Sequence, residues 1–397
     1  MRILWVTPKW TLPANDGARV ATYQLLKNLV HKDLIIDYFS ISHPDDIEDE
    51  KALRKELPVE NVYWVKRSLP KTLLEKVFYY GLSFLFKPTM PLTIASFKSS
   101  EIEKTVKSIL KNEEYDYVVA DGLHCTLPFI SSSVPIVYRS HNVESDIWKR
   151  AGVKAKNPLL KLFFTIQFFA MKNFEDKVVR HSHLVFPISD DDKKTFEISN
   201  PSSTYETIPI GMDFTSTPWK QSKIESELKL LFLGRLDWGP NKDGLIWFLD
   251  NVWSKVESYN HKLVIAGSGN SEWLEAYEDY DNIEFLGFVE DVTELYTQVD
   301  CSIVPIFYGS GTRIKLIESV ARKTPFISTE MGALGSSLKK NIDYVGAESA
   351  EEWLKAINNF STEKADIYLK NAHEILKEKY DEKAVASKLL HKLLYKD

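Results

Sequence analysis

Residues 304–335 combine groups that suit the binding of a phosphate beside a sugar. The apolar run 301–306 is typical of a strand, and it leads into Gly309-Ser310-Gly311-Thr312, which we expect to open a helix. Backbone N–H groups at such a helix start can face an anion, and the helix dipole adds to the attraction. The helix would carry two cations and a carboxylate able to accept hydroxyl hydrogen bonds: Arg313, Lys315 and Glu318. The pattern favours a nucleotide-sugar site, but a capped helix with surface charges would look the same.

Two further cations follow an earlier apolar run, residues 228–234. Arg235 comes directly after it, and Lys242 comes seven residues later at the start of a helical pattern, residues 242–257. Both can therefore lie at the carboxyl end of one strand. Arg offers a bidentate fork to phosphate, and Lys offers a movable point charge. A departing nucleoside diphosphate gains negative charge, so fixed cations there would stabilise the transition state. Surface salt bridging is the alternative.

Four motifs in this order resemble glycosyltransferase family 4, a family of retaining enzymes with the GT-B fold. They are PANDGAR (13–19), GRLDWGPNK (234–242), VIAGSG (264–269) and LGFVED (286–291). All four precede the 304–335 segment, which also resembles that family. The likeness is close over residues 228–335. The resemblance implies transfer of a hexose from a nucleotide-diphosphate sugar to a glycan hydroxyl, without a metal or another cofactor. It also implies a role in bacterial surface polysaccharide synthesis and a lipid-linked acceptor.

The resemblance also implies roles for individual residues. Arg235 and Lys242 would hold the diphosphate and, with His141, form the catalytic set. The expected donor-binding residues are Gly17, Val289, Gly311, Thr312, Arg313, Ile314, Lys315 and Glu318. Glu318 matches the glutamate that holds the ribose, whereas the family's first glutamate would fall on Ser310. This departure leaves the identity of the sugar open, and main-chain contacts around Val289 leave the base open.

Polar residues after the early strands are candidates for the acceptor side. Asp16 lies in the loop after the first strand, and Asp121 and His124 follow the strand expected at 117–120. His141 and Glu144 follow the strand expected at 136–138. Each could orient an acceptor hydroxyl or the donor sugar, although a His at a strand end is as often structural.

Short apolar runs alternate with helical patterns, which predicts parallel βαβ units with helices on both faces. We expect a first set of strands at 2–6, 35–40, 62–65, 117–120, 136–138 and 184–187, and a second at 228–233, 263–266, 283–285, 301–304 and 325–328. Helical patterns occupy 18–32, 98–112 and 158–181. The fold class is therefore α/β, with two doubly wound Rossmann-like domains facing across a cleft. The domains are expected at 1–200 and 227–380, with a linker at 201–226 and a helix at 381–397 returning to the first domain.

Length, charge and cysteine content exclude some classes of protein. A chain of 397 residues exceeds one ordinary core, and its net charge of −6 divides into +3 for residues 1–200 and −9 for 201–397. That balance excludes a nucleic-acid footprint. Two cysteines in apolar contexts indicate a reducing, cytoplasmic location without a disulfide. Asp190-Asp191-Asp192 is expected to cap a helix rather than to bind a metal.

Two stretches, residues 69–86 and 157–172, mix lysines with many large apolar side chains. They suit either peripheral contact with an anionic membrane or packing inside the first domain. Two other functions also stay open. A GT-B sugar-nucleotide epimerase would need no acceptor, and a non-catalytic subunit would bind a nucleotide sugar without turnover.

Overall fold

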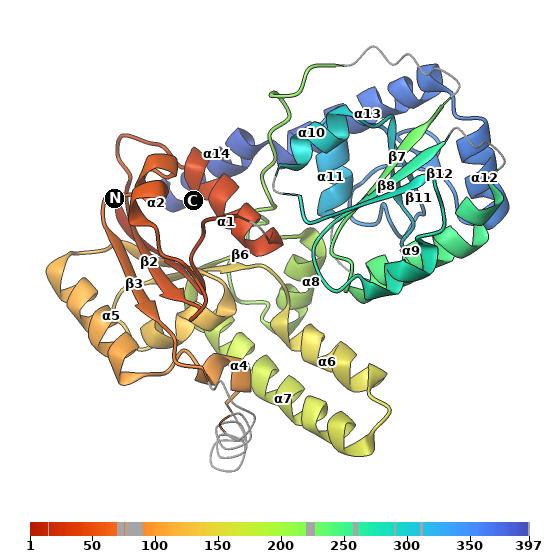
Figure 1. The fold of residues 1–397 in the computed structure, drawn as a ribbon. Coiled ribbons are helices and arrows are strands. Elements are labelled where there is room, and N and C mark those ends of the chain that lie inside the picture. Colours follow the sequence, from red (N-terminus) through yellow and green to blue (C-terminus); the bar gives the residue numbers. More distant parts are fainter. Residues whose placement is uncertain are drawn as a thin grey trace. The chain divides into compact units, whose positions relative to one another are not determined.

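The computed structural model describes residues 1–14, 16–69, 75, 90–219, 227–256, 261–289, 291–309 and 313–395 (Figure 1). The chain forms two compact units. The first contains Met1–Pro209 together with Ala386–Asp397, and the second contains Ile210–Val385. The segment expected as a linker, residues 201–226, includes the change of unit at Pro209, and its residues 220–226 lie outside the described ones.

The first unit is built on a six-stranded sheet with the order β3-β2-β1-β4-β5-β6, and every pair of neighbouring strands is parallel. Its strands are β1 (Arg2–Thr7), β2 (Ile35–Ser42), β3 (Val62–Lys66), β4 (Tyr117–Asp121), β5 (Ile136–Ser140) and β6 (Ser182–Pro187). Each lies where the apolar runs predict it, and each is one or two residues longer. The added residues bring Asp121 and Arg139 into the sheet itself.

Helices connect these strands and pack on the sheet. They are α1 (Gly17–Asn28), α2 (Glu50–Glu56), α4 (Leu92–Ala95), α5 (Ser100–Asn112), the 3-10 helix η1 (Leu123–Phe129), α6 (Glu144–Lys154), α7 (Pro158–His181) and α8 (Asp190–Ser199). One core cluster joins β1, β2 and β4 to α5 through Ile102, Val106 and Ile109. Another joins β5 and β6 to α7 and α8 through Met171, Val178 and Phe196. Both clusters are made from the periodic apolar positions of the sequence.

The second unit repeats the same architecture. Its parallel sheet has the order β12-β11-β10-β7-β8-β9. The strands are β7 (Lys229–Leu233), β8 (Lys262–Ala266), β9 (Ile283–Gly287), β10 (Cys301–Val304), β11 (Phe326–Ser328) and β12 (Val345–Gly346). The helices are α9 (Gly239–Asn251), η2 (Trp253–Lys255), η3 (Glu272–Tyr277), α10 (Val292–Thr297), α11 (Ile314–Ala321), α12 (Ala350–Asn358) and α13 (Thr362–Tyr380). Helix α14 (Glu382–Leu394) begins in the second unit, and from Ala386 on it belongs to the first.

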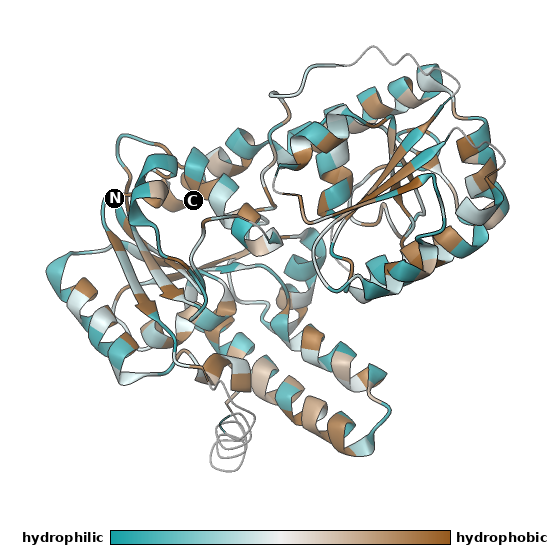
Figure 2. Ribbon diagram, in the orientation of Figure 1, coloured by the Kyte–Doolittle hydropathy of each residue, from teal (hydrophilic) through white to brown (hydrophobic). Residues whose placement is uncertain are grey.

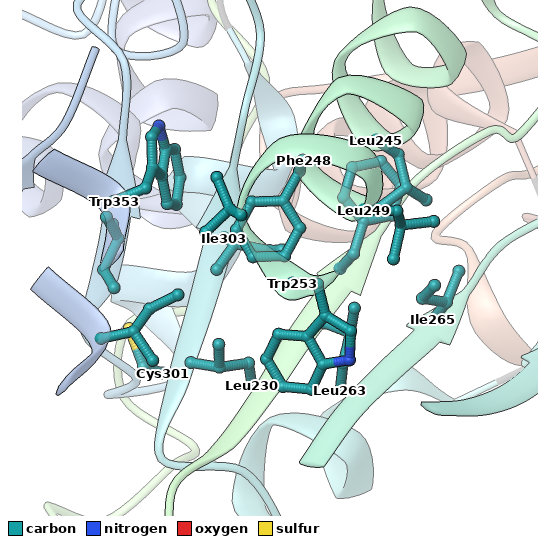
Figure 3. Close-up of a cluster of buried hydrophobic side chains, with 14 of the residues drawn as sticks. Leu230, Leu245, Phe248, Leu249, Trp253, Leu263, Ile265, Cys301, Ile303 and Trp353 are labelled. Carbon is teal, nitrogen blue, oxygen red and sulfur yellow. The ribbon is translucent and has the colours of Figure 1, made fainter. Parts of the chain in front are cut away.

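The core of the second unit lies between its sheet, α9 and α12 (Figure 3). Phe248 of α9 contacts the Trp353 ring edge-on, with 5.3 Å between the ring centres. Leu230 and Ile303, from adjacent strands, complete this layer. The doubly wound α/β class predicted for both halves is confirmed.

The strand order reverses direction between β1 and β4 in the first unit and between β7 and β10 in the second. At such a switch point the two connecting helices run to opposite faces of the sheet and leave a crevice beyond the carboxyl ends of the strands. Asp121 ends β4, and the Gly234–Arg235 turn follows β7. The topology therefore places the sequence-predicted residues of both halves at the switch points.

Four expectations about elements need correction. The helix expected at 18–32 ends at Asn28. The helix expected to begin at Lys242 begins at Gly239, because Pro240 suits a first helical turn, and it ends at Asn251. The three aspartates at 190–192 do not cap α8. Ser189 does, by accepting from the Asp192 N–H, and the aspartates fill the first turn, where the helix dipole favours negative charge. Helix α6 was not predicted at all.

Gly244 permits the close packing of α9 on the segment after β10. A Cβ at this position would overlap the carbonyl oxygen of Pro305, so Gly244→Ala is expected to lower the thermal unfolding temperature measurably. Gly152 in α6 is the matched control, because an added Cβ would lie 3.4 Å from the Phe164 Cβ. Gly152→Ala should be neutral or stabilising, since Ala is the better helix former. Equal unfolding temperatures for Gly244→Ala and the wild type would contradict this account.

Candidate functional site

In the second unit a network of three residues ties the β7 turn to α9 and α11. The Asn241 side chain donates to the Arg235 carbonyl oxygen at 2.8 Å and accepts from Lys315 Nζ at 2.8 Å. Gly234 leaves room for this contact, because a Cβ there would lie 2.8 Å from both Asn241 Nδ2 and Lys315 Nζ. The Lys315 ammonium also lies 4.3 Å from the centre of the Phe232 ring. Lys315 is thus held at the carboxyl end of β7.

The cations of this site lie in surroundings that disfavour their charge. Burial, and then the nearby Arg313 guanidinium, lowers the pKa of Lys315 to about 7. Burial also lowers the pKa of Arg313, whose guanidinium lies 5.5 Å from the Trp238 ring centre. Arg313 is the residue before α11 and not part of it, and its side chain is buried rather than solvated. A bound anion would relieve this electrostatic cost.

Glu318 lies one helical turn beyond Lys315 on α11. It is half-buried, and burial raises the pKa of its carboxyl to about 7. Asp291 is close enough to raise that pKa further, and the Arg322 guanidinium opposes the shift. Asp291 caps α10 by accepting from the Thr293 N–H at 2.8 Å. Glu318 therefore lies near Asp291 and one helical turn from Lys315.

The other two predicted cations lie on the same edge of the sheet. The Arg235 side chain is exposed and makes a two-point ion pair with Asp237, with distances of 2.5 and 3.0 Å. Lys242 lies in the first turns of α9, and its ammonium is 5.7 Å from the Trp273 ring centre. The sequence did not indicate that Asp237 and Trp273 would engage these two cations.

The remaining donor-side candidates are placed by their backbone. Ile314 is the first residue of α11, and Val289 lies two residues after the end of β9. Gly17 is the first residue of α1, after the loop that follows β1. Gly311 and Thr312, like Ser310, lie outside the described residues.

The first unit holds a buried charge cluster at its switch point. The Asp121 carboxylate is fully buried and accepts four hydrogen bonds from three segments of the chain. The donors are Trp5 Nε1 at 3.2 Å, Thr22 Oγ1 at 2.7 Å, Arg139 Nη1 at 2.7 Å and His141 Nε2 at 2.6 Å. Burial alone would raise the pKa of Asp121, but Arg139 and then His141 hold it well below its ordinary value. Asp121 is therefore a permanent anion here.

This anion fixes the orientation of His141. A carboxylate can only accept, so the Nε2 atom of His141 carries the hydrogen that faces Asp121. In the neutral ring the other nitrogen, Nδ1, is an acceptor, and the side chain is 12% exposed. Such a nitrogen can receive a hydrogen bond from a sugar hydroxyl. Asp121 thus acts through His141, and its burial argues against direct contact with an acceptor.

A second buried carboxylate, Glu175 of α7, holds the loop after His141. It accepts from the Glu144 N–H at 2.7 Å and from the Ser145 hydroxyl at 2.6 Å. Burial raises the pKa of both Glu144 and Glu175 to about 7. Glu144, an acceptor-side candidate, is therefore the first residue of α6 and lies beside Glu175, whose carboxyl can be protonated near neutral pH.

Two other candidates make structural contacts. Asp16 caps α1 by accepting from the Ala18 and Arg19 N–H groups, and it pairs with Lys9 at 2.7 Å and Arg19 at 3.0 Å. His124 packs its ring on Phe97 at 5.5 Å, and burial lowers its pKa to about 4. These contacts account for both side chains without a ligand.

Three residues of the site were missed in the sequence. Asn241 lies inside the motif GRLDWGPNK (234–242), and Arg139 directly follows the apolar run 136–138. Glu175 shares a helix face with Met171, Val178 and Val179, which are core residues. A charged residue at a core position was the available signal. In the described part of the chain, no group of three His, Cys, Asp or Glu side chains is arranged as around a metal ion.

Residues 227–363 match the family model described as "Glycosyl transferases group 1". Among curated proteins, the chain is 26% identical over 98% of both lengths to an uncharacterized 44.6 kDa protein in the cps region of Klebsiella pneumoniae. The matched segment includes β7, α11 and every donor-side residue described for the second unit. This part of the chain therefore resembles the group 1 glycosyltransferases in sequence.

Solved structures resemble the whole chain in fold. HepE of Anabaena in complex with UDP and glucose superposes with a TM-score of 0.67 at 14% identity, over 99% of both chains. Sucrose-phosphate synthase from Thermosynechococcus elongatus gives 0.69 at 15% identity, over 99% of both chains. The chain therefore has the GT-B fold, and the predicted resemblance is confirmed at the level of the group 1 glycosyltransferases.

Proposed function

We propose that this chain is a retaining glycosyltransferase of the family 4 type. It transfers a hexose from a nucleotide-diphosphate sugar to a hydroxyl of a glycan or lipid-linked acceptor, without a metal or other cofactor. The match to the group 1 family model supports glycosyl transfer, and the relative from a cps region supports a role in surface polysaccharide synthesis. We place the enzyme in the cytoplasm, with peripheral contact to the inner face of the membrane.

The observation that carries this proposal is the order of the charged side chains from Arg313 along α11. Arg313 and Lys315 stand at its start, Glu318 follows one turn later, and Asp291, two residues after Val289, is close enough to Glu318 to affect its pKa. A nucleoside diphosphate has the same order, with phosphates, then ribose, then base. Cations would meet the phosphates, the carboxylate would accept from the ribose diol, and main-chain groups would meet the base. HepE, one of the similar structures, was solved with UDP-glucose.

The family resemblance supports roles for the other residues. Arg235 and Lys242 stabilise the negative charge that develops on the leaving diphosphate. His141, held by Asp121, accepts from a hydroxyl of the donor sugar or of the acceptor. Gly17, at the start of α1, has no side chain and leaves the backbone of the first loop open to a ligand.

The experiment that tests the function is a thermal-shift panel of nucleotide sugars followed by product analysis. A ligand that binds only the folded protein raises its unfolding temperature by mass action. We expect one nucleotide sugar to stabilise the protein and to be consumed when a glycan acceptor is added. Interconversion of free nucleotide sugars would instead indicate an epimerase, and tight binding without turnover would indicate a non-catalytic subunit.

Glu318→Ala is expected to weaken binding of the intact nucleotide roughly tenfold to a hundredfold, since hydrogen bonds to a charged group are lost. Binding of inorganic pyrophosphate should change little, because it has no ribose. The variant should also be as stable as the wild type or more stable, because it removes a carboxyl whose pKa burial raises. Calorimetry with both ligands measures this. Equal losses for the two ligands would mean that Glu318 supports the phosphate turn structurally.

The affinity for a nucleoside diphosphate is expected to peak near pH 7. Below that pH the Glu318 carboxyl, with its pKa of about 7, becomes protonated and accepts poorly from the ribose. Above it Lys315, also with a pKa of about 7, loses the charge that attracts phosphate, so the affinity falls by at most about tenfold per pH unit. Lys315→Met should flatten only the alkaline side, and Glu318→Gln only the acidic side. Ligand protonation is common to all three proteins, so identical pH profiles would contradict both assignments.

A further inference from the structure

Helices α6 and α7 form a long antiparallel hairpin that extends from the sheet of the first unit (Figure 1). The helices pack tightly where Gly152 of α6 meets Phe164 of α7. Midway, the Trp148 ring contacts the rings of Phe163 and Phe164, with centres 6.3 and 6.1 Å apart. At the base Glu175 of α7 accepts hydrogen bonds from the first residues of α6. The hairpin is therefore held together along its length.

The end of the hairpin, residues 153–162, which we name the hairpin tip, exposes large apolar side chains. Val153 is 78% exposed, Leu159 77%, Leu160 51% and Leu162 58%. Figure 2 shows this end of α7 as strongly hydrophobic. Exposed apolar residues gathered on one element mark a contact surface, whereas isolated ones do not.

The same hairpin has an extreme charge balance. Residues 147–174 contain six Lys or Arg and no Asp or Glu, in a chain whose net charge is −6. Three of these cations, Lys154, Lys156 and Lys161, belong to the hairpin tip. A second copy of the chain would bring the same positive charges together, which disfavours self-association through this surface. The tip instead complements an anionic and partly apolar partner.

We propose that the hairpin tip docks the protein on an anionic lipid bilayer. The leucines and Val153 enter the boundary between headgroups and acyl chains, and the lysines lie at the lipid phosphates. Each lysine near such a surface contributes about 1 kcal/mol. A docked tip would hold the enzyme at the surface that carries a lipid-linked acceptor. This purpose of the docking rests on the proposed function. His141 precedes α6, whose eleven residues span about 16 Å, so its loop would stay within reach of that surface.

Co-sedimentation with vesicles of pure phosphatidylcholine, or of phosphatidylcholine with phosphatidylglycerol, tests this surface at low and at high salt. The wild type should bind the anionic vesicles strongly at low salt and retain a weaker, apolar component at high salt. Lys156→Glu/Lys161→Glu should lose the preference for anionic vesicles, with at least tenfold weaker partitioning. Leu159→Glu/Leu162→Glu should lose the salt-resistant component as well. All four side chains are exposed, so both variants should fold.

Matched controls change similar residues elsewhere in the first unit. Val30→Glu/Ile47→Glu replaces side chains that are 70% and 81% exposed, and Lys51→Glu/Lys55→Glu replaces exposed lysines of α2. Both control proteins should bind vesicles as the wild type does. Wild-type protein that stays in the supernatant, or equal losses in controls and tip variants, would overturn the proposal. So would self-association, seen by sedimentation velocity, that disappears in Leu159→Glu/Leu162→Glu.

The vesicle assay and the donor assay can fail independently. An Arg235→Ala/Lys242→Ala protein should still bind anionic vesicles, and the tip variants should still bind nucleoside diphosphate in solution. Vesicle binding without any nucleotide binding would refute the proposed function and leave the docking surface standing. Nucleotide turnover without vesicle binding would refute only the docking surface.

Discussion

Arg235→Ala and Lys242→Ala proteins are expected to fold normally and to turn over the nucleotide sugar at least tenfold more slowly than the wild type. A tenfold loss corresponds to about 1.4 kcal/mol of transition-state stabilisation. Both cations lie at the carboxyl end of β7, beside Lys315 and the start of α11, where the diphosphate would depart. Because the charge on the leaving group is greatest in the transition state, the loss should appear mainly in kcat. Steady-state kinetics on the purified variants measures it.

Two controls separate this role from surface salt bridging. Asp237→Asn removes the partner of Arg235, and an exposed ion pair of this kind contributes little to stability. Its turnover should therefore exceed that of Arg235→Ala. Lys262→Ala removes an exposed lysine of β8 that pairs with Glu227, and it should behave as the wild type. Unchanged turnover in both Arg235→Ala and Lys242→Ala would remove the assignment.

Asp121→Asn is expected to be the most destabilising single change in the site. It leaves the fully buried Arg139 guanidinium without its anion, and breaking a buried ion pair costs about 3–5 kcal/mol. The unfolding temperature of the first unit should fall by roughly 10 °C. Because the pKa of Asp121 is depressed, its contribution is present above the ordinary pKa of Asp and fades as the pH falls below about 4. The difference between variant and wild type should therefore shrink in acid.

A double-mutant cycle shows whether the charge pair is the cause. Asp121→Asn/Arg139→Met leaves no uncompensated charge, so it should be more stable than the sum of the two single changes predicts. Asp45→Asn, at an exposed side chain of the same unit, should be neutral. Additive effects in the cycle would mean that the ion pair is not the source of the loss.

Variants of the Asp121 cluster can distinguish an effect on the orientation of His141 from an effect on the stability of the protein. His141→Ala removes a partly exposed ring and should reduce kcat with little change in unfolding temperature. Asp121→Asn should reduce both, because it releases the ring from its fixed orientation. A stable Asp121→Asn protein with full activity would show that the orientation of His141 does not matter.

Much of the fold could be predicted because parallel strands buried on both faces produce continuous apolar runs. Residues 2–6, 117–120 and 301–304 are such runs, and each became a strand. Their ends were less certain, since Asp121 and Arg139 are charged yet belong to β4 and β5. Helix α6 was missed because its polar start, from Glu144, looked like a loop, and its buried cap, Glu175, comes from a distant helix.

The donor side could be predicted further than the acceptor side. Lys315 and Glu318 lie on one short helix and Arg313 directly precedes it, so their spacing in the sequence was enough to predict a shared ligand. The Asp121 cluster joins β1, α1, β4 and the end of β5, and no spacing along the chain reveals such a contact. The helix-capping role of Asp16 was likewise not foreseen, and its acceptor-side role stays a prediction.

The most direct test of the account is to incubate the wild type with the nucleotide sugar that stabilises it best and to follow all products by NMR. We expect release of the nucleoside diphosphate, slow without an acceptor and fast with a glycan acceptor, and strongly reduced in Lys242→Ala. The anomeric configuration of the donor should be retained in the new linkage. Conversion of the donor into a second nucleotide sugar, or an inert complex in the presence of acceptors, would contradict the account.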